Sequence, residues 1–204
     1  SITMLKTSMR ALALVALPAS LALAACNADP SETPATAQTD RDTVAQAVAS
    51  AANLSTLSRA ITDAQLAEVL DGSGSYTLFA PSDDAFAALG ENGQRLLEVE
   101  QRPLLVGLLR EHIVPGHITP DAIGTAIDEE GGSVSMTTMG GGSLTFSRNG
   151  DAITVSRDGN GMARFGGETI EADNGVVIPI DAALVPEGAT SISSQSANES
   201  TAAQ

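Results

Sequence analysis

The sequence predicts an α+β fold, with helices in the first half of the chain and β-strands in the second. Before the pair Gly131 and Gly132, apolar residues recur at the three- and four-residue spacing of helices. After that pair, apolar and polar residues alternate as they do in strands. Within the helical half, residues 76–80 form a short apolar run that ends at Pro81. We expect this run to be a buried strand.

Several amphipathic helices are expected before the glycine pair. Ser55 is a candidate N-cap for the second helix, and Pro103 fits the first turn of a later one. Pro115 ends that later helix, and Thr119 with Pro120 begins another. The apolar stripes of these helices are Val44, Val48 and Ala51; Leu54, Leu57 and Ile61; Leu66, Val69 and Leu70; Leu96, Leu97 and Val99; and Leu104, Leu105, Leu108, Leu109 and Ile113.

The strand at residues 76–80 is expected to turn into a helix at Ser82. Pro81 has no backbone N–H, so it cannot continue a sheet ladder. The Ser82 hydroxyl can accept a hydrogen bond from the first helical turn, which makes it a good N-cap. Asp83 and Asp84 then place negative charge at the positive end of the helix dipole.

The second half of the chain predicts a series of strands joined by tight turns. Asn149 with Gly150 predicts a type I′ hairpin turn, and Asn174 with Gly175 predicts another hairpin turn. The apolar residues of the expected strands are Val134 and Met136; Leu144 and Phe146; Ile153 and Val155; Ala163 and Phe165; Ile170; residues 176–180; and residues 183–185.

The N-terminal segment has the pattern of an export signal. Lys6 and Arg10 precede an apolar stretch at residues 11–17, and small residues lead to Cys26, the one cysteine of the chain. The stretch is too short and too interrupted to be a membrane span. It resembles a bacterial lipobox, which implies a signal peptide over residues 1–25 and a lipid on Cys26. The alternative is an ordinary signal peptide that is cleaved before an incidental cysteine.

Composition divides the rest of the chain into three parts. Residues 26–40 are expected to be a flexible linker, residues 41–188 the folded domain, and residues 189–204 a disordered tail.

The chain has 25 acidic and 10 basic residues, and residues 1–25 contain two of the basic ones and no acid. The remainder therefore carries 8 − 25 = −17 charges. Because phosphate backbones would repel so acidic a protein, we expect no nucleic-acid partner.

The sequence predicts no enzyme, no metal site and no cofactor. His112 and His117 are the only histidines, and Pro115 keeps them from sharing one helix face. We interpret His112 as a semi-buried structural histidine and His117 as exposed. Ser82 fits a helix cap better than a nucleophile, because no Gly-x-Ser-x-Gly elbow surrounds it.

Three stretches resemble the fasciclin-1 (FAS1) domain. TLFAPSDDAF at residues 77–86 resembles the first signature of that family, and ADNGVVIPID at residues 172–181 resembles the second. LLREHIVPG at residues 108–116 resembles the helix and His-Pro-Gly exit between them. The resemblance covers roughly residues 40–188. It implies a wedge of antiparallel β-strands with several helices packed along it, in which the first-signature strand lies beside the C-terminal strands.

The resemblance also implies a set of candidate contact residues. In many members of the family a tyrosine precedes the histidine of the middle stretch, and that pair is linked to adhesion. In this chain Glu111 takes the place of the tyrosine, which weakens the transfer of that contact. The candidate contact residues are Asp83, Asp84, Arg110, Glu111, His112, Ile113 and Asn174.

The function implied by the resemblance is non-enzymatic adhesion or interaction. The expected partner is a protein or an extracellular-matrix or surface ligand, and we expect a monomer. The lipid on Cys26 would hold the protein in the cell envelope or at the cell surface; otherwise it would be secreted. One alternative is a periplasmic scaffold or cargo-binding lipoprotein. Another is a glycan or small-molecule binder, which the chain's 2% aromatic content disfavours.

Overall fold

A computed structural model describes residues 42–158 and 160–185. The expected signal peptide, Cys26, linker and C-terminal tail lie outside these residues. The helices are α1 (Val44–Ser50), α2 (Ser55–Asp63), α3 (Ala67–Leu70), α4 (Asp83–Ala88), α5 (Glu91–Leu96), the 3-10 turn η1 (Val99–Gln101), α6 (Arg102–Glu111) and α7 (Pro120–Glu129). The strands are β1 (Tyr76–Pro81), β2 (Ile113–Pro115), β3 (Ser133–Thr137), β4 (Ser143–Asn149), β5 (Ala152–Arg157), β6 (Asn160–Arg164), β7 (Ile170–Ala172) and β8 (Gly175–Ile180).

The strands form two four-stranded sheets. The first has the order β2-β1-β8-β7, and the second has the order β3-β4-β5-β6. The fold is therefore α+β, and β1 lies beside the C-terminal strand β8 as the family resemblance implies. One detail of the expected antiparallel wedge is wrong, because β1 and β8 run parallel. Both strands leave the sheet at the same edge, which brings the two signature turns together.

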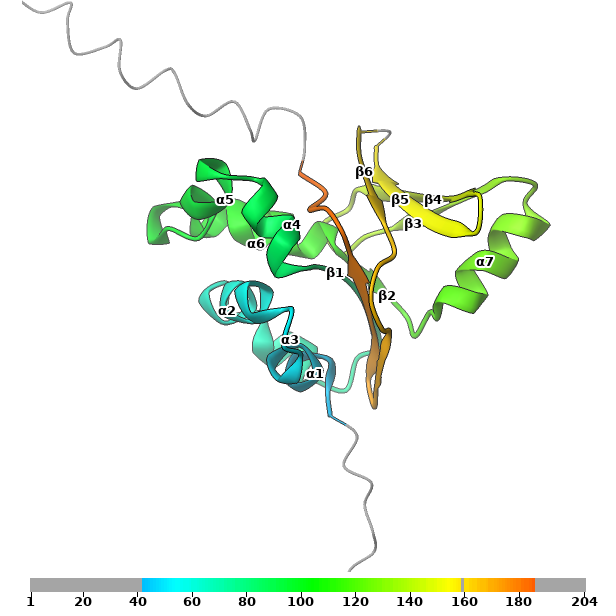
Figure 1. Cartoon of the computed structure of the whole chain (residues 1–204). Coiled ribbons are helices and arrows are strands. Elements are labelled where there is room, and N and C mark those ends of the chain that lie inside the picture. Colours follow the sequence, from blue (N-terminus) through cyan, green and yellow to red (C-terminus); the bar gives the residue numbers. More distant parts are fainter. Residues whose placement is uncertain (1–41, 159, 186–204) are drawn as a thin grey trace, which may run out of the picture. The chain divides into compact units, whose positions relative to one another are not determined.

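The first sheet is covered on both faces (Figure 1). Helices from the first half of the chain lie on one side, and the second sheet with α7 lies on the other. Alternation along β1 explains this arrangement, because successive side chains of a strand point to opposite faces. Leu78 and Ala80 join the helical core, whereas Phe79 joins the core beneath the second sheet. The neighbours in β8 follow the same rule, with Val177 on the helical side and Ile178 on the other.

Local sequence signals set the main element boundaries as expected. Ser82 accepts a hydrogen bond from the backbone of Ala85 and begins α4, as predicted. Pro103 lies in the first turn of α6, and Thr119 caps α7 with Pro120 behind it. In the described part of the chain, no helix is long and apolar enough to cross a membrane.

Other expectations are wrong in detail. The segment after α6 is not only a helix exit, because Ile113–Pro115 forms the edge strand β2 against β1. The β4–β5 turn is formed by Gly150 and Asp151, since Asn149 already pairs with Ala152. Likewise, the β7–β8 turn is formed by the two residues between Ala172 and Gly175.

Two further expectations fail because partners distant in sequence decide the structure. Ser55 is the first residue of α2 and not its cap; the N-cap position is Leu54, which makes no side-chain bond. Residues 183–185 form no strand. The Leu184 N–H instead donates to the side chain of His112.

Candidate functional site

Most of the seven candidate contact residues serve the interior of the fold. Among them, only Asp84 and Arg110 have exposed side chains. Arg110 also donates to the carbonyl oxygen of Met139. Ile113 is buried in the helical core at 1% exposure, which excludes its side chain from a surface contact. The expectation that residues 110–113 offer several side chains to a partner is therefore wrong. Among these four residues, only Arg110 is exposed.

Asp83 caps a helix to which it does not belong. Its carboxylate accepts hydrogen bonds from the backbone N–H of Thr56 at 2.7 Å and from the Ser55 hydroxyl at 2.8 Å, both at the start of α2. Partial burial opposes ionisation of Asp83, but these hydrogen bonds outweigh it and lower the pKa of the carboxyl. The side chain is thus engaged within the domain.

Replacing Asp83 by alanine is expected to reduce the free energy of unfolding by about 1–2 kcal/mol, the usual cost of a lost N-cap. The neighbouring Asp84→Ala is the matched control. Asp84 is exposed in the same helical turn, so its loss is expected to cost only a few tenths of a kcal/mol. Urea denaturation of both variants measures the difference. Equal losses would contradict the capping role.

Asn174 joins three segments. Its side-chain oxygen accepts from the Val44 N–H at 2.8 Å, at the start of α1. Its side-chain nitrogen donates to the carbonyl oxygens of Leu70, the last residue of α3, and of Gly72 just beyond it. These bonds satisfy backbone groups at two helix ends. The second-signature asparagine therefore stabilises the domain, and its amide is not free for a partner.

His112 is buried, with 1% of its surface exposed. The Leu184 N–H donates to Nε2 at 3.0 Å, so Nδ1 carries the proton and donates to the Leu108 carbonyl oxygen at 2.8 Å. Burial lowers the pKa of His112 to about 4, although the bond to Leu108 acts to raise it. Both ring nitrogens make hydrogen bonds within the domain. The sequence predicts a semi-buried histidine, and the structure buries it more deeply than that.

Glu111 lies next to His112 but turns its carboxylate inward. The Thr138 hydroxyl donates to it at 2.6 Å, and Arg157 lies 3.6 Å away. Gly140 and Gly142 pack so closely on the carboxylate that a Cβ at either position would overlap it. The space that Glu111 needs thus explains Gly140 and Gly142, whereas Gly141 has a positive φ of +90° that favours glycine.

An open depression lies where the two signatures meet. It measures about 440 Å³, and its walls come from the turn after β1, the turn after β8, Asn53 before α2, and the segment between β6 and β7. The carboxylate of Asp181 in this depression already accepts a hydrogen bond from the Arg164 N–H at 2.7 Å. Within the described residues no group of three or more His, Cys, Asp or Glu side chains is placed to hold a metal ion. The lining residues are Asn53, Ser82, Asp83, Asp84, Gly166, Gly167, Ile180 and Asp181.

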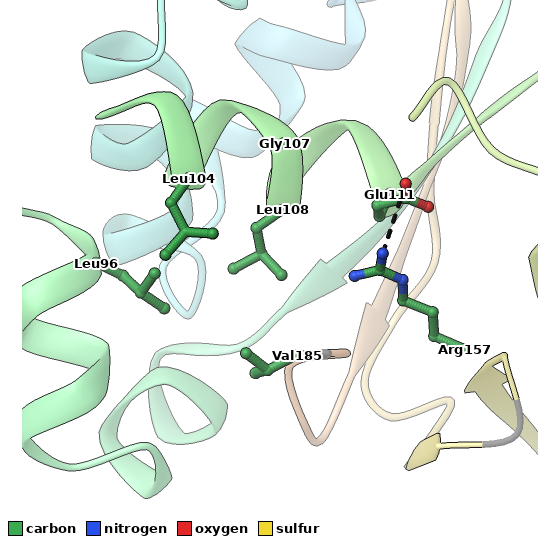
Figure 2. Close-up of a pocket in the computed structure, with 7 residues that line it drawn as sticks. All are labelled: Leu96, Leu104, Gly107, Leu108, Glu111, Arg157 and Val185. Atoms are coloured by element: carbon green, nitrogen blue, oxygen red, sulfur yellow. Dashed lines mark ion pairs between the residues drawn. The ribbon is translucent and has the colours of Figure 1, made fainter. Parts of the chain in front are cut away.

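A smaller, mainly apolar pocket lies beside α6 (Figure 2). Arg157 and Glu111 stand at one side of it, facing a group of leucines. Sequence reasoning missed this pocket. The one local signal was Gly107, because glycine inside a helix costs stability and calls for an explanation. Its lining residues are Leu96, Leu104, Gly107, Leu108, Glu111, Arg157 and Val185.

Comparison with known proteins identifies relatives over most of the described domain. The family model for the Fasciclin domain matches residues 52–186. Protein sll1483 of Synechocystis sp. is 34% identical over 148 residues, which are 71% of this chain and 73% of that protein. Transforming growth factor-beta-induced protein ig-h3 of Sus scrofa is 30% identical over 138 residues, which are 67% of this chain but only 18% of that much longer protein.

A solved structure has a similar fold. It is a FAS1 domain pair from the insect cell adhesion molecule fasciclin I, with a TM-score of 0.64 and 17% sequence identity. The match covers 72% of this chain and 52% of the solved chain. The fold comparison and the family model agree. The chain belongs to the fasciclin domain family.

Proposed function

We propose that this protein is a non-catalytic adhesion or interaction module held in the cell envelope by a lipid on Cys26. The observation that carries the proposal is the Fasciclin match over residues 52–186. The insect relative with this fold is a cell adhesion molecule. The domain would bind a protein or a matrix or surface ligand, with residues 26–40 as the spacer between membrane and domain.

The described surface offers a contact region for this function. The signature turns come together at the open depression, where Asp84 is exposed. The histidine and the carboxylate of the middle stretch are both engaged in the fold. These features support binding through surface loops and give no support to catalysis by His112.

Deletion of the gene is expected to reduce attachment of cells to a surface, and wild-type protein is expected to restore it. A Cys26→Ser protein is expected not to restore attachment, because an acidic domain without its lipid would leave the membrane. Attachment counts after washing measure this, and immunoblotting verifies that both proteins are made in equal amount.

The other outcomes assign different functions. Equal rescue by both proteins would mean that adhesion does not need the lipid. Unchanged attachment after deletion would overturn the adhesion proposal and favour a scaffold or cargo-binding lipoprotein inside the envelope. Protease treatment of intact cells would then separate a surface-exposed domain from a periplasmic one.

A further inference from the structure

The pocket beside α6 is a small cavity with an apolar wall and a charged side. It measures about 140 Å³. Figure 2 shows Leu96, Leu104, Leu108 and Val185 on one side, with the guanidinium of Arg157 projecting toward them from the other. Leu96 and Leu104 belong to α5 and α6, and the turn that joins these helices carries Val99, which is 70% exposed. An exposed apolar residue thus lies in the segment between two lining residues.

Gly107 is an exposed residue of α6 that lines this pocket, and glycine there has a cost to helix stability. Glycine inside a helix is less stable than alanine by about 1 kcal/mol. Packing does not require glycine at this position, because a Cβ added there would meet nothing within 4 Å. The contrast with Gly140 and Gly142, which crowd against Glu111, is clear. The space beside Gly107 is therefore open, and a side chain at this position would not clash with a packed neighbour.

Arg157 has hydrogen-bonding capacity to spare. Its side chain is 17% exposed, and its Nε is buried with no hydrogen-bond partner among the described residues. The distances to Glu111 and Asp158 are both 3.6 Å, beyond the usual N–H···O range of about 2.7–3.2 Å. A buried donor without a partner is costly. Nε itself is covered, but the guanidinium faces the pocket, so a ligand's acceptor would meet Arg157 at the outer nitrogens of this group (Figure 2).

The volume decides what class of ligand fits. Pockets for metabolites and cofactors are typically about 300–1,000 Å³. A cavity of about 150 Å³ lined by leucine-like residues accommodates a benzene-sized group. The pocket at about 140 Å³ matches a single apolar side chain, and such pockets receive the anchor residues of protein–protein interfaces.

The charges around the pocket indicate which residues of a partner should flank the apolar anchor side chain. Glu111 and Asp158 flank Arg157, so the local charge of these three groups is −1. The whole chain carries 25 acidic residues against 10 basic ones. A neutral acceptor such as a main-chain carbonyl suits Arg157 better than a carboxylate, and basic residues beside the anchor would complement the acidic domain.

We propose that this pocket binds one leucine-, methionine- or phenylalanine-sized side chain from a basic peptide segment of a partner protein, whose main-chain carbonyl accepts from Arg157. The inference rests on the proposed interaction function and specifies the kind of partner.

The probe is the peptide N-acetyl-Lys-Leu-Lys-amide, added to the full chain at millimolar concentration and followed by methyl NMR. The Leu104, Leu108 and Val185 methyl signals are expected to shift and saturate. N-acetyl-Lys-Ser-Lys-amide lacks the anchor and is expected to bind at least about tenfold more weakly. N-acetyl-Glu-Leu-Glu-amide keeps the anchor and is expected to bind more weakly than the lysine peptide. Equal shifts with leucine and serine peptides, or no saturable shift, would overturn the proposal.

Two substitutions at one position make a matched pair. Gly107→Leu is expected to fill the pocket and abolish saturable binding. Gly107→Ala adds only a methyl group and is expected to retain binding within about threefold. Both gain helix propensity, so neither should melt below wild type. Retained binding by Gly107→Leu would show that the peptide binds elsewhere.

Other occupants give different results. A chain ending at Val185 keeps every described element; if its pocket methyls shift without peptide, residues 186–204 fill the pocket and the proposal is wrong. Shifts that depend on protein concentration alone would mean a second copy, which also overturns it. Cell attachment separates the two proposals. Rescue by Gly107→Leu would leave adhesion standing without this pocket, whereas peptide binding with no attachment defect would leave the pocket standing without adhesion.

Discussion

Replacing Phe79 by alanine is expected to lower the free energy of unfolding by roughly 3–5 kcal/mol. Phe79 is fully buried in β1, the strand that pairs with both β2 and β8. Its ring lies 5.0 Å from that of Phe146 and 5.8 Å from that of Phe165, centroid to centroid. The substitution therefore removes one ring of a three-ring cluster in which Phe79 of the first sheet meets Phe146 of the second.

The magnitude follows from two losses that add. Truncation leaves a cavity that a rigid sheet cannot collapse around, and the aromatic contacts contribute about 0.5–1.5 kcal/mol beyond the area they bury. Single domains are stable by only about 5–15 kcal/mol in total. We expect a folded but much weakened domain, with its denaturation midpoint shifted far toward lower denaturant.

Met162→Ala is the control for this prediction. Met162 is also apolar and lies on β6, but it is 64% exposed, so its loss is expected to change stability by less than about 0.5 kcal/mol. Phe79→Leu keeps most of the volume and is expected to fall between the two. Similar stability of Phe79→Ala and Met162→Ala would show that the cluster does not join the sheets energetically.

The sequence predicted elements where neighbours in the chain decide the structure. The β1–Ser82–α4 turn is such a case, because Pro81, the cap and the helical turn lie within a few residues. The start of α6 at Pro103 and the start of α7 at Thr119 are others. Alternation of apolar residues likewise predicted β3, β4 and β5, which form hairpins with adjacent partners.

The sequence could not predict contacts made by residues far apart in the chain. Asp83 caps α2 from 27 residues away, and Asn174 holds the start of α1 from 130 residues away. In each case a polar residue in a signature was interpreted as a partner contact, although its bonds lie inside the domain. Short polar side chains look alike in sequence whether they bond to water, to a partner or to a distant helix end.

The pocket beside α6 was unpredictable for a related reason. Gly107 gave a local signal, but Arg157 reaches the pocket from β5 and Val185 from the chain after β8. No pattern of spacing connects these positions. The replacement of the family tyrosine by Glu111 pointed to the right place without revealing that Thr138 and two glycines enclose the carboxylate.

Lowering the pH from 6.5 to about 4 is expected to reduce the stability of the domain by roughly 3 kcal/mol through His112 alone. The pKa of this histidine is 6.5 in an unfolded chain and about 4 in the fold, mainly because of burial. Between these values the unfolded chain binds a proton that the folded domain does not. Stability is therefore full above pH 6.5, falls as the pH decreases, and levels off below about 4.

The physical reason lies in the two hydrogen bonds of the ring. A protonated His112 would have a donor at Nε2 facing the Leu184 N–H donor, in a site with no water-exposed surface to spare. Urea denaturation at a series of pH values measures the slope. NMR titration of the His112 ring in the folded protein measures its pKa directly, without any substitution.

His112→Gln separates this group from the carboxylates. The variant is expected to lose the slope between pH 6.5 and 5 whatever its stability at neutral pH, because glutamine does not titrate. Exposed His117→Gln is expected to keep the slope. Asp83 and Asp128 have lowered pKa values, so their stabilising contributions are lost only as the pH falls below the ordinary 3.8 of an aspartate. An unchanged slope in His112→Gln would therefore assign the pH dependence to groups other than the buried histidine and contradict its neutral, doubly bonded state.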